Sequence, residues 1–161
     1  MPLTKTDKED LKRLKKRMKL NDAEAFYSLG GDYAMGGLVN IDFMKTLELW
    51  NKAAELGSIK AHYRLGFSYF HGEGVEKDTG KALQHYKLAA IGGHEMARYN
   101  LGCMEMESNG NVVRAMKHWM IAAKSGLDMS LKQVGIGYKR GYVTKDDYAK
   151  TLRAIKHLGM R

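Results

Sequence analysis

Residues 61–93 read AHYRLGFSYFHGEGVEKDTGKALQHYKLAAIGG, and this stretch decides the fold because copies of it lie on both sides. Its Leu-Gly pair at 65–66 recurs at 29–30 and 101–102, and as Val-Gly at 134–135. Other positions in the same phase are Ala25, Ala61, Ala97 and Ser130; Tyr33, Tyr69, Glu105 and Tyr138; Trp50, Tyr86 and Trp119; and Gly57, Gly93 and Gly126. Successive copies are offset by 36, 36 and 33 residues. Self-similarity at a period of this length indicates stacked structural repeats.

Each copy predicts two helices. From Ala61 the repeated positions fall at i, i+4, i+5 and i+8, and from Ala82 at i, i+4, i+7 and i+8, which are single faces of a helix. Glycine inside a helix costs about 1 kcal/mol relative to alanine, so the glycine after each Leu predicts close approach of another backbone. Asp42 and Asp78 are placed to cap the second helices, and Gly57, Gly93 and Gly126 to end them.

The ends of the chain continue the register. Leu20 and Asn21 lie 36 residues before Leu56 and Gly57, which predicts a helix over Leu11–Leu20 with Leu11, Leu14 and Met18 turned inward. Thr144 and Asp147 resemble a capping box that starts a last helix over 145–157. The prediction is a single all-α domain, a right-handed α-solenoid of about nine helices: a basic cap 1–22, repeats 23–58, 59–94 and 95–127, and a degenerate repeat with C-terminal cap 128–161.

The pattern A-x-x-x-L-G-x-x-Y-x-x-G-x-G-V-x-x-D-x-x-K-A-x-x-x-Y-x-x-A-A-x-x-G at 61–93 resembles the Sel-one-like repeat (SLR), a relative of the tetratricopeptide repeat. Resemblance extends over residues 23–141. Departures occur at Leu38, Thr46, Glu105 and Ser108. The resemblance implies an adaptor that holds other proteins together, with no catalytic residues to carry over.

Composition limits the class of protein. The 161 residues include 44% hydrophobic residues and a single cysteine, with no apolar run suited to a signal sequence or membrane anchor. These features predict an intracellular protein of the cytoplasm, compatible with the nucleus and without membrane contact. Partner identity and oligomeric state are not encoded in any pattern of the sequence.

The net charge of +9 is concentrated at the ends. Residues 1–20 carry eight Lys/Arg and three Asp/Glu, residues 21–128 eleven and thirteen, and residues 129–161 eight and two, giving +5, −2 and +6. A solvated outer face is the favoured interpretation, and binding of nucleic acid or an acidic surface is the alternative. The N-terminal basic patch consists of Lys12, Arg13, Lys15, Lys16, Arg17 and Lys19.

No catalytic or cofactor motif is recognisable. The run VGIGYKRG at 134–141 lacks dinucleotide-binding spacing and a preceding strand, and the six histidines lack metal-ligand spacing. Cys103 has no activating base placed beside it. The sequence therefore predicts a protein that is not an enzyme, with no metal and no cofactor.

A binding face is the more defensible functional prediction. In tetratricopeptide-like stacks the first helix of each unit lines the concave side. By that resemblance, the partner-binding residues would include Tyr27, Tyr63, Phe67, Phe70, Tyr99, Cys103 and Met106. Aromatic residues are enriched in interface hot spots, although periodicity alone leaves open whether the repeated tyrosines line a groove or pack in the core. The predicted function is a non-catalytic scaffold or adaptor for a protein or peptide; nucleic-acid or acidic-surface binding through the basic ends is the alternative.

Overall fold

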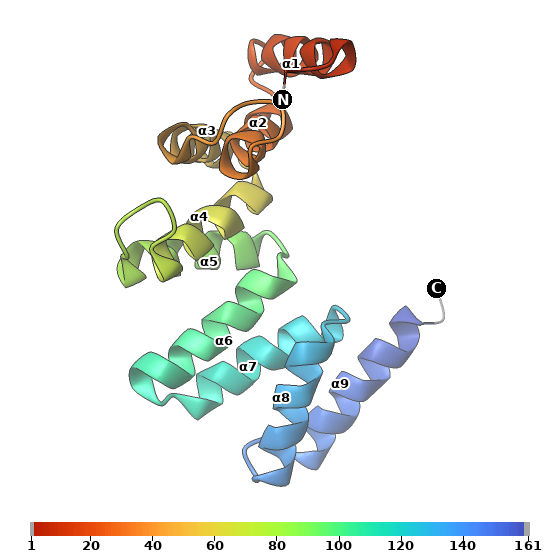
Figure 1. Cartoon of the computed structure of the whole chain (residues 1–161). Helices are drawn as coiled ribbons and strands as arrows, with labels where there is room; N and C mark the ends of the chain where they lie inside the picture. The colour runs from red at the N-terminus through yellow and green to blue at the C-terminus, as the bar shows by residue number, and fades with distance from the viewer. Residues whose placement is uncertain (1, 160–161) are drawn as a thin grey trace. The chain divides into compact units, whose positions relative to one another are not determined.

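The computed structural model describes residues 2–159, apart from the side chain of Asn109, and this part of the chain forms nine α-helices and no strand (Figure 1). The predicted all-α class and number of helices are confirmed. The helices are α1 Lys5–Met18, α2 Ala23–Met35, α3 Phe43–Glu55, α4 Ile59–His71, α5 Thr79–Ile91, α6 Glu95–Asn109, α7 Val112–Lys124, α8 Asp128–Lys139 and α9 Lys145–Leu158.

The helices group into two compact units, the first ending at Leu88 and the second beginning at Ala89. In the first unit α1 packs on α2, α2 on α3, and α3 on α4. In the second unit α6 packs on α7, while α7, α8 and α9 contact one another. Apart from the contact between α7 and α9, these pairs join helices that follow one another in the sequence, as in other repeat proteins.

The positions that recur in the sequence are the core. The Leu or Val before each repeated glycine is buried, and the small residue four positions before that Leu or Val is fully buried. Alanine pairs on the second helices let the helices approach closely. The buried set comprises Ala25, Ala61, Ala97 and Ser130; Leu29, Leu65, Leu101 and Val134; and the alanine pairs 53–54, 89–90 and 122–123.

The repeated glycine accommodates an aromatic side chain, not the backbone that the sequence predicted. A Cβ atom added at Gly30 would lie 2.5 Å from Cδ1 of Trp50, and one at Gly66 would lie 2.7 Å from Cδ1 of Tyr86. A Cβ atom at Gly102 would overlap the indole of Trp119 in the same way. The three glycines thus leave room for the large buried aromatic residue of their own hairpin.

Hydrogen bonds hold the two indoles in place. Nε1–H of Trp50 donates to the carbonyl of Tyr27, and Nε1–H of Trp119 donates to the carbonyl of Tyr99, both at 3.2 Å. Each acceptor lies three residues before the repeated glycine. A buried indole N–H without a partner would be costly, so this bond supports the repeated geometry.

The fourth unit does not repeat this contact, and the prediction that Gly135 occupies the same environment is wrong. A Cβ atom at Gly135 would meet only the hydroxyl of Tyr148, at 3.8 Å. The crowded glycine is Gly137, where an added Cβ atom would overlap the Met116 sulfur and lie 3.2 Å from Cγ2 of Val143. The last helix, α9, carries no tryptophan or tyrosine at the position of Trp119, so the glycine is not needed there.

Helix ends follow the predicted chemistry. Asp42 accepts a hydrogen bond from the Lys45 N–H at 3.1 Å, and Asp78 accepts one from the Lys81 N–H at 2.9 Å. Asn21 has φ of 55°, as the register step from Gly57 predicted. Left-handed conformations at Gly57, Gly93 and Gly126 and the hydrogen bond from the Asp147 N–H to Thr144 are confirmed as well.

The N-terminal helix begins earlier than predicted. It runs from Lys5 to Met18 in place of Leu11–Leu20, because Thr4 and Asp7 form a reciprocal capping box. Leu11, Leu14 and Met18 are half-buried, and α1 has no fully buried residue. The helix is thus docked on α2 by a modest apolar contact.

A second repeated contact joins the two helices of each hairpin. The first-helix position three residues after the repeated glycine is tyrosine in two repeats and glutamate in the third, and its second-helix partner is lysine or arginine. Two pairs are cation–π contacts with the ammonium 5.2 Å from the ring, and the third is an ion pair of 3.3 Å. The pairs are Tyr33–Lys45, Tyr69–Lys81 and Glu105–Arg114.

Candidate binding surface

The three predicted interface tyrosines lie partly in the core. Each is half-buried, and its ring contacts the aromatic residue of the second helix in its own hairpin. Part of each ring therefore packs in the core, and the rest reaches the surface, where it could line a groove. The ring-centroid distances are 6.4 Å for Tyr27–Trp50, 6.0 Å for Tyr63–Tyr86 and 6.3 Å for Tyr99–Trp119.

The remaining predicted interface residues divide between the two units. Phe67 and Phe70 are half-buried in the first unit, where the Phe70 ring lies 6.5 Å from the Tyr86 ring. Cys103 and Met106 belong to the second unit, and Met106 is 38% exposed. Within the first unit the structure brings Tyr27, Tyr63, Phe67 and Phe70 to the α2–α5 region, and within the second it places Tyr99, Cys103 and Met106 on α6.

An open groove lies between α2, α3 and α4 in the first unit. Two hollows of about 250 and 260 Å³ share Ala34, Met35, Trp50 and Arg64, so they adjoin one another. Each hollow is smaller than the usual pocket for a small molecule and is closer in size to a single side chain. We term this feature the α2–α4 groove; its other lining residues are Tyr27, Ser28, Gly31, Asp32, Phe43, Thr46, Leu47, Ser68 and Glu73.

Gly31 opens the groove. A Cβ atom added there would meet no atom within 4 Å. The same repeat position holds Phe67 in the second repeat and Cys103 in the third. The first repeat therefore has free space where the others carry a side chain, and Met35, which is 79% exposed, borders it. Flexible methionine side chains adapt well to a partner.

Arg64 provides the positive charge of the groove. It is exposed, and it forms no ion pair with an acidic residue in the described part of the chain. Asp32 also lines the groove, where burial raises the pKa of its carboxyl group and a hydrogen bond from the Leu38 N–H opposes that effect. The Asp32 carboxylate is thus occupied by the loop after α2, whereas the Arg64 guanidinium remains available to a partner.

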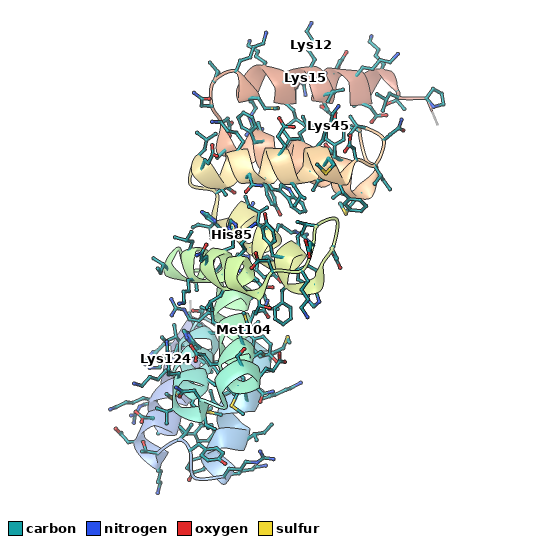
Figure 2. The ribbon with its side chains drawn as sticks, turned by 90° about the vertical axis from the view of Figure 1, so that its left-hand side faces the viewer. Lys12, Lys15, Lys45, His85, Met104 and Lys124 are labelled. Atoms are coloured by element: carbon teal, nitrogen blue, oxygen red, sulfur yellow. The ribbon has the colours of Figure 1, made fainter. Side chains whose placement is uncertain are left out.

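The basic patch on α1 is divided by ion pairs. All six predicted residues are exposed, but Arg13 pairs with Asp10 at 3.5 Å and Arg17 with Asp22 at 2.7 Å. The lysines line a separate open hollow of about 530 Å³, termed here the lysine groove. Its residues are Lys8, Leu11, Lys12, Lys15, Lys16 and Lys19. Figure 2 shows Lys12 on the side of α1 that faces away from α2 and α3.

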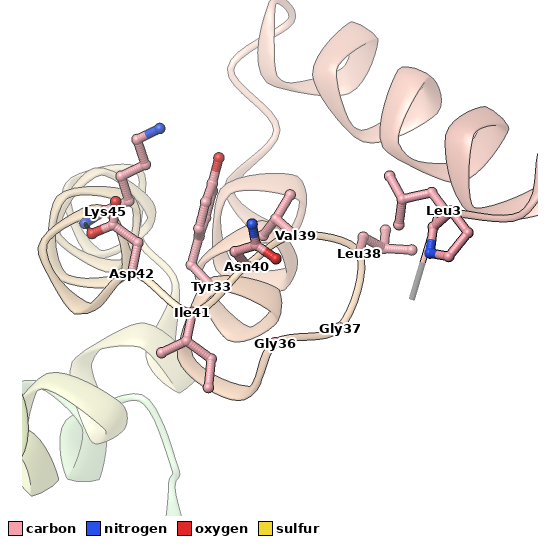
Figure 3. A pocket seen from close by; sticks show the side chains of 11 residues that line it. Leu3, Tyr33, Gly36, Gly37, Leu38, Val39, Asn40, Ile41, Asp42 and Lys45 are labelled. Carbon is pink, nitrogen blue, oxygen red and sulfur yellow. Dashed lines mark hydrogen bonds between the residues drawn. The ribbon is translucent and has the colours of Figure 1, made fainter.

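A larger hollow of about 750 Å³ lies beside the loop that joins α2 and α3 (Figure 3). Its charged groups already have partners, because Asp42 caps α3 and the Lys45 ammonium lies over the Tyr33 ring. Leu38 and Leu3 point toward one another across it. In the second repeat the position of Leu38 is Gly74, where φ is 68° and an added Cβ atom would lie 2.9 Å from Phe43. Leu38 does not have a positive φ, so the loop of the first repeat does not require glycine at this position.

His62 and His85 contact each other, and Cys103 is a half-buried thiol. Nδ1 of His62 lies 3.0 Å from Nδ1 of His85, and burial lowers the pKa of both side chains. Burial raises the pKa of the Cys103 thiol, so little thiolate forms near neutral pH. Within residues 2–159, no three His, Cys, Asp or Glu side chains are placed to hold one metal ion.

Comparison with known proteins identifies the repeat. A family model described as Sel1 repeat matches residues 23–58, 59–94 and 96–127. The chain belongs to the Sel1 repeat family. Sel1 repeat proteins are generally scaffolds for protein–protein interaction, and their fold is typically non-catalytic. A search of curated proteins finds no match.

Solved structures support the helical-repeat solenoid class. A protective antigen of uropathogenic Escherichia coli that displays an SLR fold matches 92% of this chain with 32% identity and a TM-score of 0.79. A Sel1 repeat protein from Oxalobacter formigenes matches 95% with 27% identity and a TM-score of 0.81. This chain spans 33% and 65% of the lengths of those two proteins. An immunity protein from Pseudomonas aeruginosa, at 16% identity and a TM-score of 0.51, shows likeness of fold alone.

Sequence reasoning missed several residues of the surfaces. Arg64 and Met35 were not predicted. The glycine at position 31, where the second repeat has Phe67, was a signal in the sequence that this part of the surface is open. Lys8 was also missed, although it lies four residues before Lys12 on the same flank of α1. No helix in the described residues has the length and apolar character needed to cross a membrane.

Proposed function

We propose that this Sel1 repeat chain is a non-catalytic adaptor that binds a protein or peptide segment in the α2–α4 groove. The observation that carries the proposal is the open space at Gly31, which lies among aromatic, methionine and arginine side chains on the first-helix side of the hairpin. Rigid aromatic residues next to an unfilled pocket are typical of interface hot spots.

The chemistry of the groove defines what it can hold. Tyr27, Trp50 and Met35 offer apolar contact, and the Arg64 guanidinium offers charge-assisted hydrogen bonds. A partner segment that places an apolar side chain in the space at Gly31, and a carboxylate or carbonyl oxygen near Arg64, would make both kinds of contact. A hollow of about 250 Å³ suits one such anchor and not an extended cofactor.

The test combines partner capture with a variant at the open position. Gly31→Phe introduces the side chain that the second repeat carries at Phe67, and it enters open space, so the fold should persist. Met44→Phe is the matched control, since Met44 is 77% exposed and does not line the groove. Circular dichroism would verify that both variants are folded.

For a partner identified by affinity capture and then purified, Gly31→Phe and Arg64→Ala are each expected to weaken binding about tenfold or more. Met44→Phe should leave the affinity unchanged. Equal affinity of all four proteins for the purified partner would remove the groove from the proposal.

A further inference from the structure

We propose that α1 carries a second interaction surface, the lysine groove, which binds an acidic and amphipathic segment of a protein partner. This surface is built by α1 and its C-cap residue Lys19, and it shares no residue with the α2–α4 groove. Four observations support it: unpaired charge, regular spacing, an apolar floor, and the absence of groups that would suit a phosphate ligand.

The charge of the groove is uncompensated within the described chain. Both arginines of α1 are ion-paired, with Asp10 and Asp22 respectively, but none of the five lysines of the groove forms an ion pair with any acidic residue of 2–159. Five ammonium groups of one sign on a single helix repel one another. A partner that brings carboxylates relieves this repulsion and is attracted from a distance.

The spacing of the lysines fits a polypeptide. Lys8, Lys12, Lys15 and Lys19 recur at i, i+4, i+7 and i+11, so they follow one flank of α1. The rise from Lys8 to Lys12 is about 6 Å and the whole stripe is about 16 Å long. Carboxylates four residues apart on a partner helix, or on alternate residues of an extended segment, have nearly the same separation.

The floor of the groove is apolar. Leu11, which is half-buried, lines the groove together with the lysine side chains, whose methylene stems are apolar. A purely acidic chain would leave this surface in contact with water. A segment with apolar side chains between its acidic residues would bury it, and this favours an amphipathic partner.

Phosphate ligands fit less well. No aromatic side chain lines the groove, so nucleotide bases have no surface on which to stack. Arg13 and Arg17, which could hold a phosphate with two hydrogen bonds, are already ion-paired. A lipid surface would take up the apolar face of an amphipathic helix, but Leu14 and Met18 are half-buried where α1 packs on α2.

The experiment uses the full chain and defined probes. Fluorescence anisotropy would measure binding of a labelled 15-residue peptide of glutamate and leucine, with leucine at every third or fourth position. The comparison probes are the same peptide with serine in place of leucine, a 15-nucleotide oligouridylate, and phosphatidylserine vesicles. The protein variants are Lys12→Gln/Lys15→Gln/Lys19→Gln and a control with equal loss of charge, Lys87→Gln/Lys117→Gln/Lys124→Gln. All six lysines are exposed, and all lie within helices except Lys19, which caps the C-terminal end of α1.

The glutamate–leucine peptide is expected to bind the wild-type chain more tightly than the serine peptide, and more weakly as salt rises from 50 to 200 mM. The α1 triple variant should weaken binding about tenfold, the combined effect of three exposed ion pairs. The control triple variant and Gly31→Phe should retain wild-type affinity.

Three results would overturn the proposal. Equal binding of the leucine and serine peptides would show that the apolar floor does not contribute to binding, and the partner would not need to be amphipathic. An equal loss in both triple variants would show that net charge alone attracts the peptide. Tighter, α1-dependent binding of oligouridylate or vesicles would assign the surface to a phosphate-bearing partner.

Discussion

Gly30 and Gly31 are consecutive residues of α2 with opposite surroundings, and substitution of each by alanine tests the packing of the repeat. A Cβ atom at Gly30 would lie 2.5 Å from Cδ1 and 2.7 Å from Nε1 of Trp50. A Cβ atom at Gly31 would enter open space. The two variants add the same methyl group to the same helix, so each serves as the control for the other.

The expected magnitudes follow from two effects. Both substitutions gain about 1 kcal/mol of helix stability. At Gly30 the added methyl group also crowds a buried indole whose N–H is bonded to the Tyr27 carbonyl, and overpacking of this kind costs about 1 to 3 kcal/mol. We therefore expect Gly31→Ala to stabilise the protein by about 0.5 to 1 kcal/mol and Gly30→Ala to be less stable than Gly31→Ala by about 1 to 3 kcal/mol.

Urea-induced unfolding, followed by far-ultraviolet circular dichroism, would measure the free energy of unfolding of both variants. The slope of the free energy against urea concentration should match the wild-type value, which shows that the same surface unfolds. If both variants shift the free energy equally, Trp50 accepts the methyl group without cost, and the explanation of the repeated glycine is refuted.

Arg114→Ala should lower the free energy of unfolding by about 1 to 2 kcal/mol, because buried Glu105 loses its partner. The same substitution should cost little in a Glu105→Gln background. A double-mutant cycle measures the difference, and equal costs in the two backgrounds would contradict the pairing. Because burial lowers the folded-state pKa of His62 and His85, the unfolded chain binds more protons below pH 6.5, and stability should fall as the pH drops through 6.5 toward those lowered values. Urea titrations at pH 7.5 and 5.5 should show a smaller fall for His62→Gln/His85→Gln, and an identical fall would argue against this origin. Cys103 should react with iodoacetamide more slowly than glutathione does at pH 8, and a comparable rate would show that its thiol is not shielded.

Much of the fold could be predicted because periodicity reports burial. Ala25, Leu65 and Trp119 recur since each repeat must pack on its neighbours, and all three are buried. Capping could also be read, as Asp42 and Asn21 show. What failed was the identity of the group beside Gly66: sequence indicates that space is required there, but not whether backbone or the Tyr86 ring fills it.

The candidate surfaces were only partly predictable. The repeat register identified Tyr27 as a candidate. The exposure of the Tyr27 ring, however, depends on its contacts with Trp50 and with Lys60, whose ammonium lies 5.7 Å from the ring. The basic patch of α1 was evident from composition. Of the two arginine ion pairs that divide it, Arg13–Asp10 is an i,i+3 pair that a helical register allows, whereas Arg17–Asp22 depends on how the chain turns after α1.

The pairs Tyr33–Lys45 and Glu105–Arg114 each place both members within one hairpin. Such a hairpin can be duplicated, deleted or exchanged as a block during evolution without a compensating change in the adjacent repeat at this position. The salt bridge from Lys60 to Glu24 joins consecutive repeats, so exchange of either repeat alone can break it.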